Sequence, residues 1–490
     1  MSLKQKAFSA GRWTATSAIL VAGLQLLQTV VLARLLLPAE FGLMAVAASL
    51  LAVIALIADL GLSRALIHFD DARADTLSSL YWLNVGLSLL LMLLLLISAP
   101  VFGDLYGSTA LVPVLQSGSL VFPLTAWGQQ FRVLAERSLR FSELARIEIL
   151  AGLAGCGFAI AFAFAGGGVY ALVAGILVRA AVSSALAWTM LSAGSRPFRH
   201  LRLAETRPFL HFGGYLVGDS LANNVRRDAD VFVGGLVLGP AAMGLFSVPR
   251  DLSLRIATVI NPVITRVGFP IMSRLQGDRG KLKEVYLQTL RMATSVNFPV
   301  YVMLALFADE IVALLYGPQW QGAELYLRIL AAWGLLRSVG NTAGGLLYAV
   351  GKAKRAFWWN FGLLLILPPL YWLAVGKWGL EGLAWGVVML QLVITLPGWR
   401  FLVQPACGAG LLEYLQQLIV PLWLSLAAGT VAWIATRSLD HGTLRLLVGG
   451  SVGGVFYLAL SWIFNRRWAD AMIGMLRFGA LSPTTKESKQ

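Results

Sequence analysis

Residues 80–101 read LYWLNVGLSLLLMLLLLISAPV and contain no Asp, Glu, Lys or Arg. At about 1.5 Å per residue they form a helix roughly 33 Å long, which is sufficient to cross a hydrocarbon core of about 30 Å. A transmembrane β-strand would instead alternate polar and apolar side chains over about ten residues. This stretch therefore predicts a membrane-spanning α-helix.

Apolar runs of this kind continue along the whole chain. Hydrophobic residues make up 58% of the 490 positions and charged residues 13%, whereas soluble proteins carry about 25% charged residues. We predict an all-α, polytopic membrane protein with about 14 transmembrane helices and no soluble catalytic domain. The predicted spans are 13–36, 41–63, 80–101, 111–131, 147–166, 169–192, 211–236, 241–264, 292–316, 322–349, 356–376, 379–399, 412–435 and 444–464.

The distribution of basic residues predicts the orientation of the chain. A net charge of +15 would suggest nucleic-acid binding in a soluble protein. With the N-terminus in the cytoplasm, however, 28 of the 39 Lys and Arg residues fall in cytoplasmic segments, 4 in outer loops or at the outer ends of spans, and 7 deeper within spans. Cytoplasmic loops of membrane proteins are enriched in Lys and Arg. We therefore expect both termini in the cytoplasm and no nucleic-acid partner.

The sequence also contains an internal repeat. Residues 38–43 (PAEFGL) resemble residues 240–245 (PAAMGL) at an offset of 202 positions. Three further matches follow in the same order, at similar offsets: Leu105-Tyr106-Gly107 with Leu315-Tyr316-Gly317, Ala126-Trp127-Gly128 with Ala332-Trp333-Gly334, and Gly168 and Gly175 with Gly379 and Gly386. Four ordered matches indicate that predicted spans 1 to 6 and 7 to 12 are two copies of one unit.

The repeat predicts the domain organisation. Each copy has an even number of spans, so the two copies have the same orientation and are related by an axis along the membrane normal. We expect an N-terminal lobe at 1–207, a C-terminal lobe at 208–403, two extra spans within 404–467 and a cytoplasmic tail at 468–490. Transporters with internal repeats bind their substrate between the halves, near the membrane midplane. The pattern therefore favours a transporter.

Three stretches of the sequence resemble one known family. They are residues 32–42 (LARLLLPAEFG), 59–66 (DLGLSRAL) and 315–320 (LYGPQW). Over nearly its whole length the chain resembles the Wzx-type flippases of the multidrug/oligosaccharidyl-lipid/polysaccharide exporter superfamily. The resemblance implies a bacterial inner-membrane protein that moves an undecaprenyl-diphosphate-linked oligosaccharide from the cytoplasmic to the periplasmic leaflet. Membrane lipids and the polysaccharide polymerase or export machinery are then its expected partners.

Arginines inside the predicted spans are candidates for the substrate site. A charged residue facing lipid costs several kcal/mol, so such residues mostly face a bundle interior or a wet cavity. Arg179, Arg250 and Arg337 lie at mid-depth in their predicted spans. The planar guanidinium donates two hydrogen bonds to a phosphate while staying charged. We predict that these three residues hold the diphosphate in a cationic cavity; pairing with acidic residues of other spans is the alternative.

Polar residues of spans 1 and 7 extend the predicted site. Gln25 and Gln28 correspond, at the offset of 202, to Arg227 and Asp230, so both copies place polar groups at one depth. The further candidates for substrate binding are Arg226, Arg227, Asn223, Asn224, Gln25 and Gln28. Some of these charges are explained equally well as ion pairs within one helix, because Arg226 and Asp230 stand at i,i+4.

Acidic residues within the spans are candidates for coupling transport to an ion gradient. They are Asp59, Asp219 and Asp230. No phosphate-binding loop of the form GxxxxGK[ST] occurs, so any energy would come from gradients. The chain has two Cys and four His residues without metal-binding spacing, and we expect neither a metal nor a cofactor.

Two other functions remain open from the residues. A cation or drug antiporter of the same superfamily would be expected to offer acidic residues to its substrate. The cavity candidates are instead seven basic residues (Arg179, Arg226, Arg227, Arg250, Arg255, Arg328 and Arg337) and five acidic ones (Asp59, Asp219, Asp228, Asp230 and Asp251). A polysaccharide polymerase or ligase would need a substantial outer loop with catalytic groups, whereas the predicted outer loops are short. We therefore expect a transporter and not an enzyme.

Overall fold

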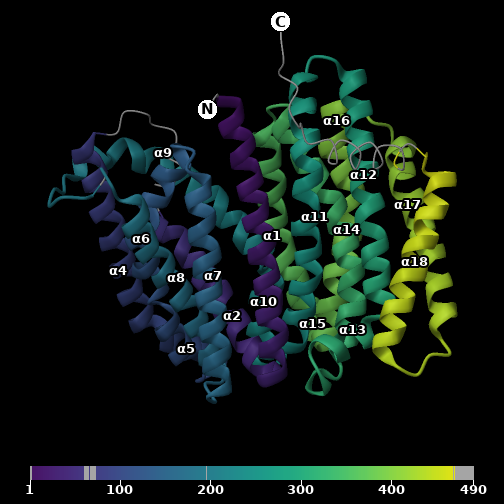
Figure 1. Ribbon diagram of the computed structural model, residues 1–490, viewed down its shortest axis with the longest axis horizontal. Coiled ribbons are helices and arrows are strands. Elements are labelled where there is room, and N and C mark those ends of the chain that lie inside the picture. Colours follow the sequence, from purple (N-terminus) through teal and green to yellow (C-terminus); the bar gives the residue numbers. More distant parts are fainter. Residues whose placement is uncertain (1–2, 60–65, 67–72, 195, 467, 469–490) are drawn as a thin grey trace, which may run out of the picture. The chain divides into compact units, whose positions relative to one another are not determined.

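A computed structural model describes residues 3–59, 66, 73–194, 196–466 and 468 of the chain (Figure 1). Within these residues the structure is helical and contains no strand. The contacts divide the chain into two compact units, which consist of Met1–Val248, Leu315–Trp320 and Phe357–Gly386, and of Pro249–Leu314, Gln321–Ala356 and Val387–Gln490.

The first unit contains most of the N-terminal half. Its helices run roughly alongside one another in Figure 1. They are α1 (Leu3–Leu35), α2 (Pro38–Asp59), α4 (Ala74–Leu105), α5 (Leu111–Gly118), α6 (Val121–Arg137), α7 (Phe141–Phe164), α8 (Val169–Leu191), α9 (Leu203–Arg227), α10 (Ala229–Leu238) and the 3-10 helix η1 (Ala241–Met243).

The second unit contains most of the C-terminal half. Its elements are α11 (Gly244–Arg274), α12 (Arg279–Leu306), α13 (Ala308–Leu315), α14 (Ala323–Ala349), the π-helix η3 (Trp399–Val403), α16 (Gln404–Cys407), α17 (Leu411–Thr436) and α18 (Gly442–Phe464). The first five residues of α11, 244–248, and the last residue of α13 belong to the first unit. Helix α15 (Ala353–Gly398) contributes to both units, and η2 (Pro318–Trp320) belongs to the first.

The helices confirm the predicted fold class. Nine described helices are long and apolar enough to cross a membrane, or ten if α12 and α13, bent by 79° at their junction, form one span. Each of the fourteen predicted ranges coincides with described helix, although residues 60–63 of the second range lie outside the described residues. The chain is thus an all-α, multi-pass membrane protein, and fourteen stays the predicted number of spans.

Helix α15 is in fact a hairpin of two predicted spans. Its backbone leaves the helical region at Trp378 (φ −130°, ψ 15°) and Gly379 (φ 60°, ψ −143°). A Cβ on Gly382 would lie 2.2 Å from the carbonyl oxygen of Ala374, eight residues earlier. In a straight helix these residues would be about 12 Å apart along the axis. The chain therefore turns back at Gly379, between the predicted spans 356–376 and 379–399.

The same turn occurs in the first copy of the repeat. Gly168, which precedes α8, has φ 54° and ψ −138°, nearly the values of Gly379. This region of positive φ is readily accessible to glycine and strained for other residues. The equivalence of Gly168 and Gly379, found from the sequence, therefore extends to their backbone conformation.

The two PAEFGL-like motifs pack directly on each other. A Cβ on Gly42 would lie 2.2 Å from the carbonyl oxygen of Pro240, and a Cβ on Gly244 would lie 1.7 Å from that of Pro38. Both glycines have room for a hydrogen atom and for nothing larger. A contact in which each element meets its own equivalent is the kind that a two-fold axis produces.

A second reciprocal contact lies beside the first. The Tyr106 ring approaches Gly235 of α10, where a Cβ would lie 3.0 Å away. In the other direction, the Trp320 indole nitrogen donates a hydrogen bond of 2.7 Å to the carbonyl oxygen of Ala33. Ala33 and Gly235 are separated by the repeat offset of 202. In each copy of the repeat, the turn that follows the third predicted span thus contacts the first predicted span of the other copy.

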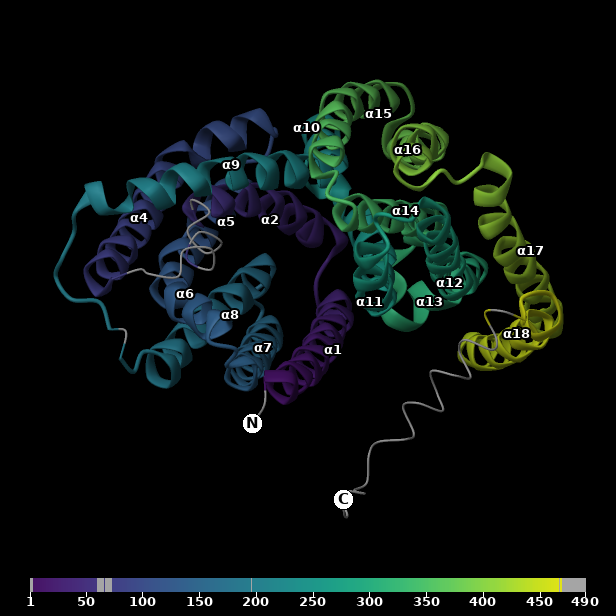
Figure 2. The same ribbon diagram turned by 90° about the horizontal axis from the view of Figure 1, so that it is seen from above.

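Helices α17 and α18 lie side by side in both views and have no counterpart in the repeat (Figure 2). Gly449 and Gly453 of α18 face α12, where added Cβ atoms would meet Phe307 at 2.4 Å and Met303 at 1.8 Å. Small residues four positions apart allow membrane helices to approach closely. Within the same unit, Tyr457 donates a hydrogen bond of 2.6 Å to the carbonyl oxygen of Ser295.

Candidate functional site

Two of the predicted arginines meet on one tryptophan in the second unit. The guanidinium carbon of Arg337 lies 5.0 Å from the ring centroid of Trp333, and that of Arg250 lies 5.9 Å from it. Both distances are within the range of about 6 Å in which a cation is attracted to an aromatic face. Arg337 follows Trp333 by one helical turn on α14, whereas Arg250 comes from α11. The structure therefore brings these two predicted residues together.

Arg250 is the more enclosed member of this pair. It is 4% exposed, and its Nη1 atom lies 3.6 Å from Oδ1 of Asp251. Trp333 is 3% exposed, while Arg337 is partly exposed. The aromatic ring and the neighbouring carboxylate reduce the repulsion between two guanidinium groups in one place. Trp333 was predicted as part of the repeat but not as a member of this site, although its i,i+4 spacing to Arg337 is visible in the sequence.

Arg179 lies in the first unit, on α8. Its Cβ packs against Gly155 of α7, where an added Cβ would be 2.8 Å away. Its electrostatic neighbours include Glu148 of α7 and Arg132 of α6. Because span 6 itself contains no acidic residue, the nearby negative charge comes from another span, as one of the two predicted alternatives required.

The polar segment of span 7 is interrupted at Asp228. The backbone there (φ −106°, ψ 14°) separates α9 from α10, so Arg226 and Asp230 do not lie on one continuous helix. Arg226 donates a hydrogen bond of 3.0 Å to Oδ1 of Asn223, and Arg227 forms an ion pair of 3.1 Å with Asp228. Oδ1 of the buried Asp230 accepts a hydrogen bond from the backbone amide of Val231. The i,i+4 alternative for Arg226 and Asp230 assumed one continuous helix, which the break at Asp228 interrupts.

The remaining predicted residues have separate surroundings. Gln28 points toward α8, where its Nε2 atom would be 3.3 Å from a Cβ on Gly175. Gln25 and Asn224 are partly exposed, and Asn224 donates a hydrogen bond to the carbonyl oxygen of Ser220. The side chain of Asp219 lies outside the described residues.

Asp59 has a partner that the sequence did not reveal. The Nε2 atom of Gln129, on α6, lies 2.5 Å from Oδ1 of Asp59 at the end of α2. The two residues are 70 positions apart, so no local pattern indicates this contact. Among the described residues, no group of three or more His, Cys, Asp or Glu side chains could hold a metal ion.

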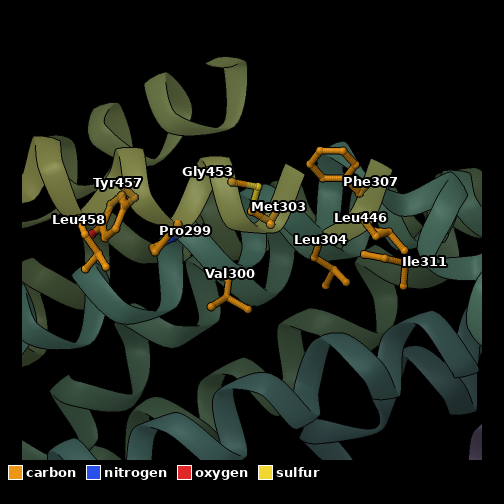
Figure 3. A pocket seen from close by; sticks show the side chains of 12 residues that line it. Pro299, Val300, Met303, Leu304, Phe307, Ile311, Leu446, Gly453, Tyr457 and Leu458 are labelled. Atoms are coloured by element: carbon orange, nitrogen blue, oxygen red, sulfur yellow. The ribbon is translucent and has the colours of Figure 1, made fainter. Parts of the chain in front are cut away.

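An apolar groove lies between α12 and α18 in the second unit (Figure 3). It has a volume of about 490 Å³, and its lining includes Pro299, Val300, Met303, Phe307 and Leu446. Gly450, Gly453 and Gly454 have no side chains to fill it. A groove of this composition can accommodate an apolar chain and offers no partner to a sugar or a phosphate.

The chain has the fold of solved lipid and multidrug transporters. Among solved structures, the chain is similar to the lipid II flippase MurJ in its inward closed conformation, with a TM-score of 0.72, 13% identity and coverage of 92% of this chain and 98% of that one. It is also similar to a multidrug resistance MATE family transporter in its inward-facing conformation, with a TM-score of 0.63, 18% identity and coverage of 78% and 94%.

Sequence comparison identifies the family. Residues 31–325 match the family described as polysaccharide biosynthesis protein, and the chain belongs to this family. It is 30% identical to the lipopolysaccharide biosynthesis protein WzxC of Escherichia coli over 88% of each chain. It is 27% identical to the teichuronic acid biosynthesis protein TuaB of Bacillus subtilis, over 98% of this chain and 100% of that one. The succinoglycan biosynthesis transport protein ExoT of Rhizobium meliloti is 25% identical, over 95% and 94%.

These comparisons confirm the family predicted from residues 32–42, 59–66 and 315–320. In line with the prediction of a transporter, ExoT is named as a transport protein and MurJ as a lipid II flippase.

Proposed function

We propose that this protein is a flippase for an undecaprenyl-diphosphate-linked oligosaccharide, which it moves from the cytoplasmic to the periplasmic leaflet for surface polysaccharide synthesis. The observation that carries the proposal is the pair of guanidinium groups of Arg250 and Arg337 on Trp333. Two bidentate cations at one place match the two phosphates of a diphosphate. The further proposed substrate contacts are Arg179, Arg226, Arg227, Asn223, Asn224, Gln25 and Gln28.

The groove between α12 and α18 supports a lipid-linked substrate. A polyprenyl chain gains about 0.8 kcal/mol for each CH₂ group that leaves water, and in the membrane an apolar groove lets it stay in apolar surroundings while its head group enters the protein. The extra helix α18 supplies half of this groove. A transporter of small hydrophilic solutes would have no use for it.

The membrane potential favours the proposed direction. With the cytoplasm negative, each negative charge that moves outward gains about 2.3 kcal/mol per 100 mV. Asp59, Asp219 and Asp230 are the residues proposed to couple transport to an ion as well. We further propose that the protein works beside the polysaccharide polymerase or export machinery, which consumes its product.

The proposed location is the bacterial inner membrane, with both termini in the cytoplasm. The asymmetric distribution of Lys and Arg supports this orientation. Cysteines introduced at Ser108, Gly167 and Gln319 should react with an impermeant maleimide from the outside, and cysteines at Arg140 and Lys281 should react after permeabilisation. Labelling of position 281 in intact cells would contradict the topology.

The alternative function is a cation or drug antiporter, and the observation that favours it is the similarity of the fold to a MATE family multidrug transporter. The two functions differ in the phenotype of a deletion strain. Loss of a flippase should leave lipid-linked oligosaccharide in the cytoplasmic leaflet and abolish the surface glycan. Loss of an antiporter should increase sensitivity to cationic drugs and leave the glycan unchanged. Mass spectrometry of the accumulated lipid would also identify its sugars.

A further inference from the structure

The first unit also contains a polar pocket. It has a volume of about 360 Å³ and lies between the N-terminal half of α1, the C-terminal half of α6 and the beginning of α7. Small-molecule sites generally occupy about 300 to 1,000 Å³. The polar side chains that line the pocket are Ser17, Thr125, Gln129, Arg132, Glu136 and Glu148.

The charges around this pocket are balanced. Nη2 of Arg132 and Oε1 of Glu148 are 3.8 Å apart, which is too far for a hydrogen bond between them. Their side chains are 37% and 41% exposed, so both keep hydrogen-bonding capacity for a ligand. Arg179 interacts electrostatically with both. The lining itself carries one guanidinium, of Arg132, and two carboxylates, of Glu136 and Glu148, and the guanidinium of Arg179 nearby offsets the excess negative charge.

The lining mixes hydrogen-bond donors, acceptors and one aromatic ring. Arg132 donates, Glu136 and Glu148 accept, and the hydroxyl groups of Ser17 and Thr125 can do both. The hydrogen bond from Gln129 to Asp59 fixes the orientation of the Gln129 amide. Phe141 adds an apolar face to the same pocket. A neutral ligand with many hydroxyl groups and apolar C–H faces, which is a sugar, satisfies this combination.

We propose that this pocket binds a saccharide unit of the transported lipid-linked oligosaccharide. The inference rests on the proposed function and deepens it, because it names the part of the substrate that the first unit recognises. Arg179 lies beside the pocket through its shared neighbour Glu148. A residue proposed to bind phosphate thus lies next to residues proposed to bind a sugar. The substrate has the same order, because its first sugar is attached to the diphosphate.

The pocket would make transport selective for the glycan. A site that hydrogen-bonds the hydroxyl groups of its ligand strongly rejects analogues that lack them, because its buried polar groups are then left unpaired. An arginine site by contrast holds every undecaprenyl diphosphate equally. This pocket therefore selects among glycans, and the arginines bind the lipid diphosphate that these substrates share.

Binding to purified full-length protein in nanodiscs tests this division. The two probes are undecaprenyl diphosphate without sugar and the lipid-linked oligosaccharide isolated from the deletion strain. Glu148→Gln, Glu136→Gln and Gln129→Leu should each weaken binding of the glycosylated lipid by about tenfold or more. The same variants should leave binding of the sugar-free lipid within twofold. Glu284→Gln, the same change on an exposed position of α12, is the matched control and should alter neither.

Several results would overturn the inference. Equal weakening of both lipids, or no change in either, would remove the pocket from glycan recognition. Binding of tetraphenylphosphonium that the Glu variants abolish would assign the pocket to a cation. Thr125→Val keeps the volume of the side chain and removes its hydroxyl group, and protein abundance is measured in parallel. Weaker binding of the glycosylated lipid at normal abundance indicates a lost ligand contact, whereas reduced abundance indicates misfolding. If the wild-type protein binds neither lipid, the result contradicts the proposed function itself and not only the role of this pocket.

Discussion

Trp127 and Trp333 occupy equivalent positions in the two copies of the repeat and have different surroundings. Trp127 on α6 is 56% exposed, and its ring centroid lies 6.3 Å from that of Trp188. Trp333 on α14 is 3% exposed and is approached by the guanidinium groups of Arg250 and Arg337. One copy places an aromatic ring beside this tryptophan, and the other places two guanidinium groups beside it.

The next helical turn shows the same difference. Phe131, four residues after Trp127, is fully buried and packs at 4.8 Å on Trp188. Its equivalent, four residues after Trp333, is Arg337. The repeat thus preserves the backbone at Gly168 and Gly379 and the contact between Gly42 and Gly244, while its polar residues have diverged. Equivalent positions of the two copies therefore share backbone structure and packing but carry side chains of different chemistry.

The largest effect should come from breaking the symmetric contact. Gly244→Val would place a Cβ 1.7 Å from the carbonyl oxygen of Pro38, and Gly42→Val would place one 2.2 Å from that of Pro240. Overpacking of this kind costs about 1 to 3 kcal/mol or more, and here the obstacle is backbone. Both variants should be nearly absent from the membrane by immunoblot. Gly23→Ala, which has open space around it, is the control; normal levels of either valine variant would contradict the reciprocal packing.

The next effect tests the charge of the second copy. Arg337→Gln and Arg250→Gln should leave protein abundance near normal and reduce glycan export by about tenfold or more, because hydrogen bonds to charged groups are worth about 1.5 to 3 kcal/mol. Arg179→Gln should act in the same direction. Lys at position 337 should restore part of the activity, as a point charge without the bidentate fork.

Abundance and export must be measured in the same strains. If an arginine serves as a structural ion-pair partner, its removal strands a buried carboxylate, and abundance should fall together with export. The matched variant in the first copy is Phe131→Leu, which should lower abundance and leave export per molecule unchanged. Normal export by all three Gln variants would eliminate the cationic site.

A smaller effect should distinguish the two tryptophans. Trp333→Phe keeps an aromatic face at reduced strength, and the lost cation–π attraction of about 0.5 to 2 kcal/mol should weaken binding of undecaprenyl diphosphate between twofold and about thirtyfold. Trp127→Phe should leave this binding unchanged, since no guanidinium is described near its ring. Equal effects of the two substitutions on lipid affinity would show that the difference between the copies has no functional meaning.

The smallest expected effect concerns the N-terminal ends of α4 and α12, which contain the third predicted span of each copy. Asp278 caps α12 by accepting hydrogen bonds of 3.1 Å from the amides of Gly280 and Lys281, whereas Arg73, which precedes α4, makes no side-chain cap. The backbone hydrogen bond from Lys281 is the main reason that the pKa of Asp278 lies below its ordinary value. The stabilisation is therefore present above the unfolded-state pKa of about 3.9 and is lost as the pH falls through the lower, folded-state pKa.

Asp278→Asn keeps a good cap and removes the charge. Its melting temperature in detergent should be slightly lower than that of the wild type at neutral pH, and the difference should disappear on acidification. Arg73→Ala should show no comparable pH dependence. A difference between Asp278→Asn and the wild type that grows toward low pH would contradict the sign of the shift.

The sequence was sufficient for the large features because each depends on local composition. Apolar length predicts a spanning helix wherever residues such as 80–101 occur, since the backbone must satisfy its own hydrogen bonds in lipid. The repeat was visible because close packing permits only glycine at Gly42 and Gly244 and positive φ favours it at Gly168 and Gly379. The turn within α15 was predicted between residues 376 and 379 for the same reason.

The partners of the polar residues required the tertiary structure. Spacing along a helix made a pair of Arg226 and Asp230 one alternative, but α9 ends before Asp228, and Arg226 donates a hydrogen bond to Asn223 on α9 itself. The contact of Asp59 with Gln129 joins residues from two helices, as does the meeting of Arg250 and Arg337 at Trp333. Apolar burial and backbone geometry are imposed residue by residue and can be read from a sequence. A charge in a membrane is satisfied by whichever group the packing of other helices places beside it, and that choice is made only when the chain has folded.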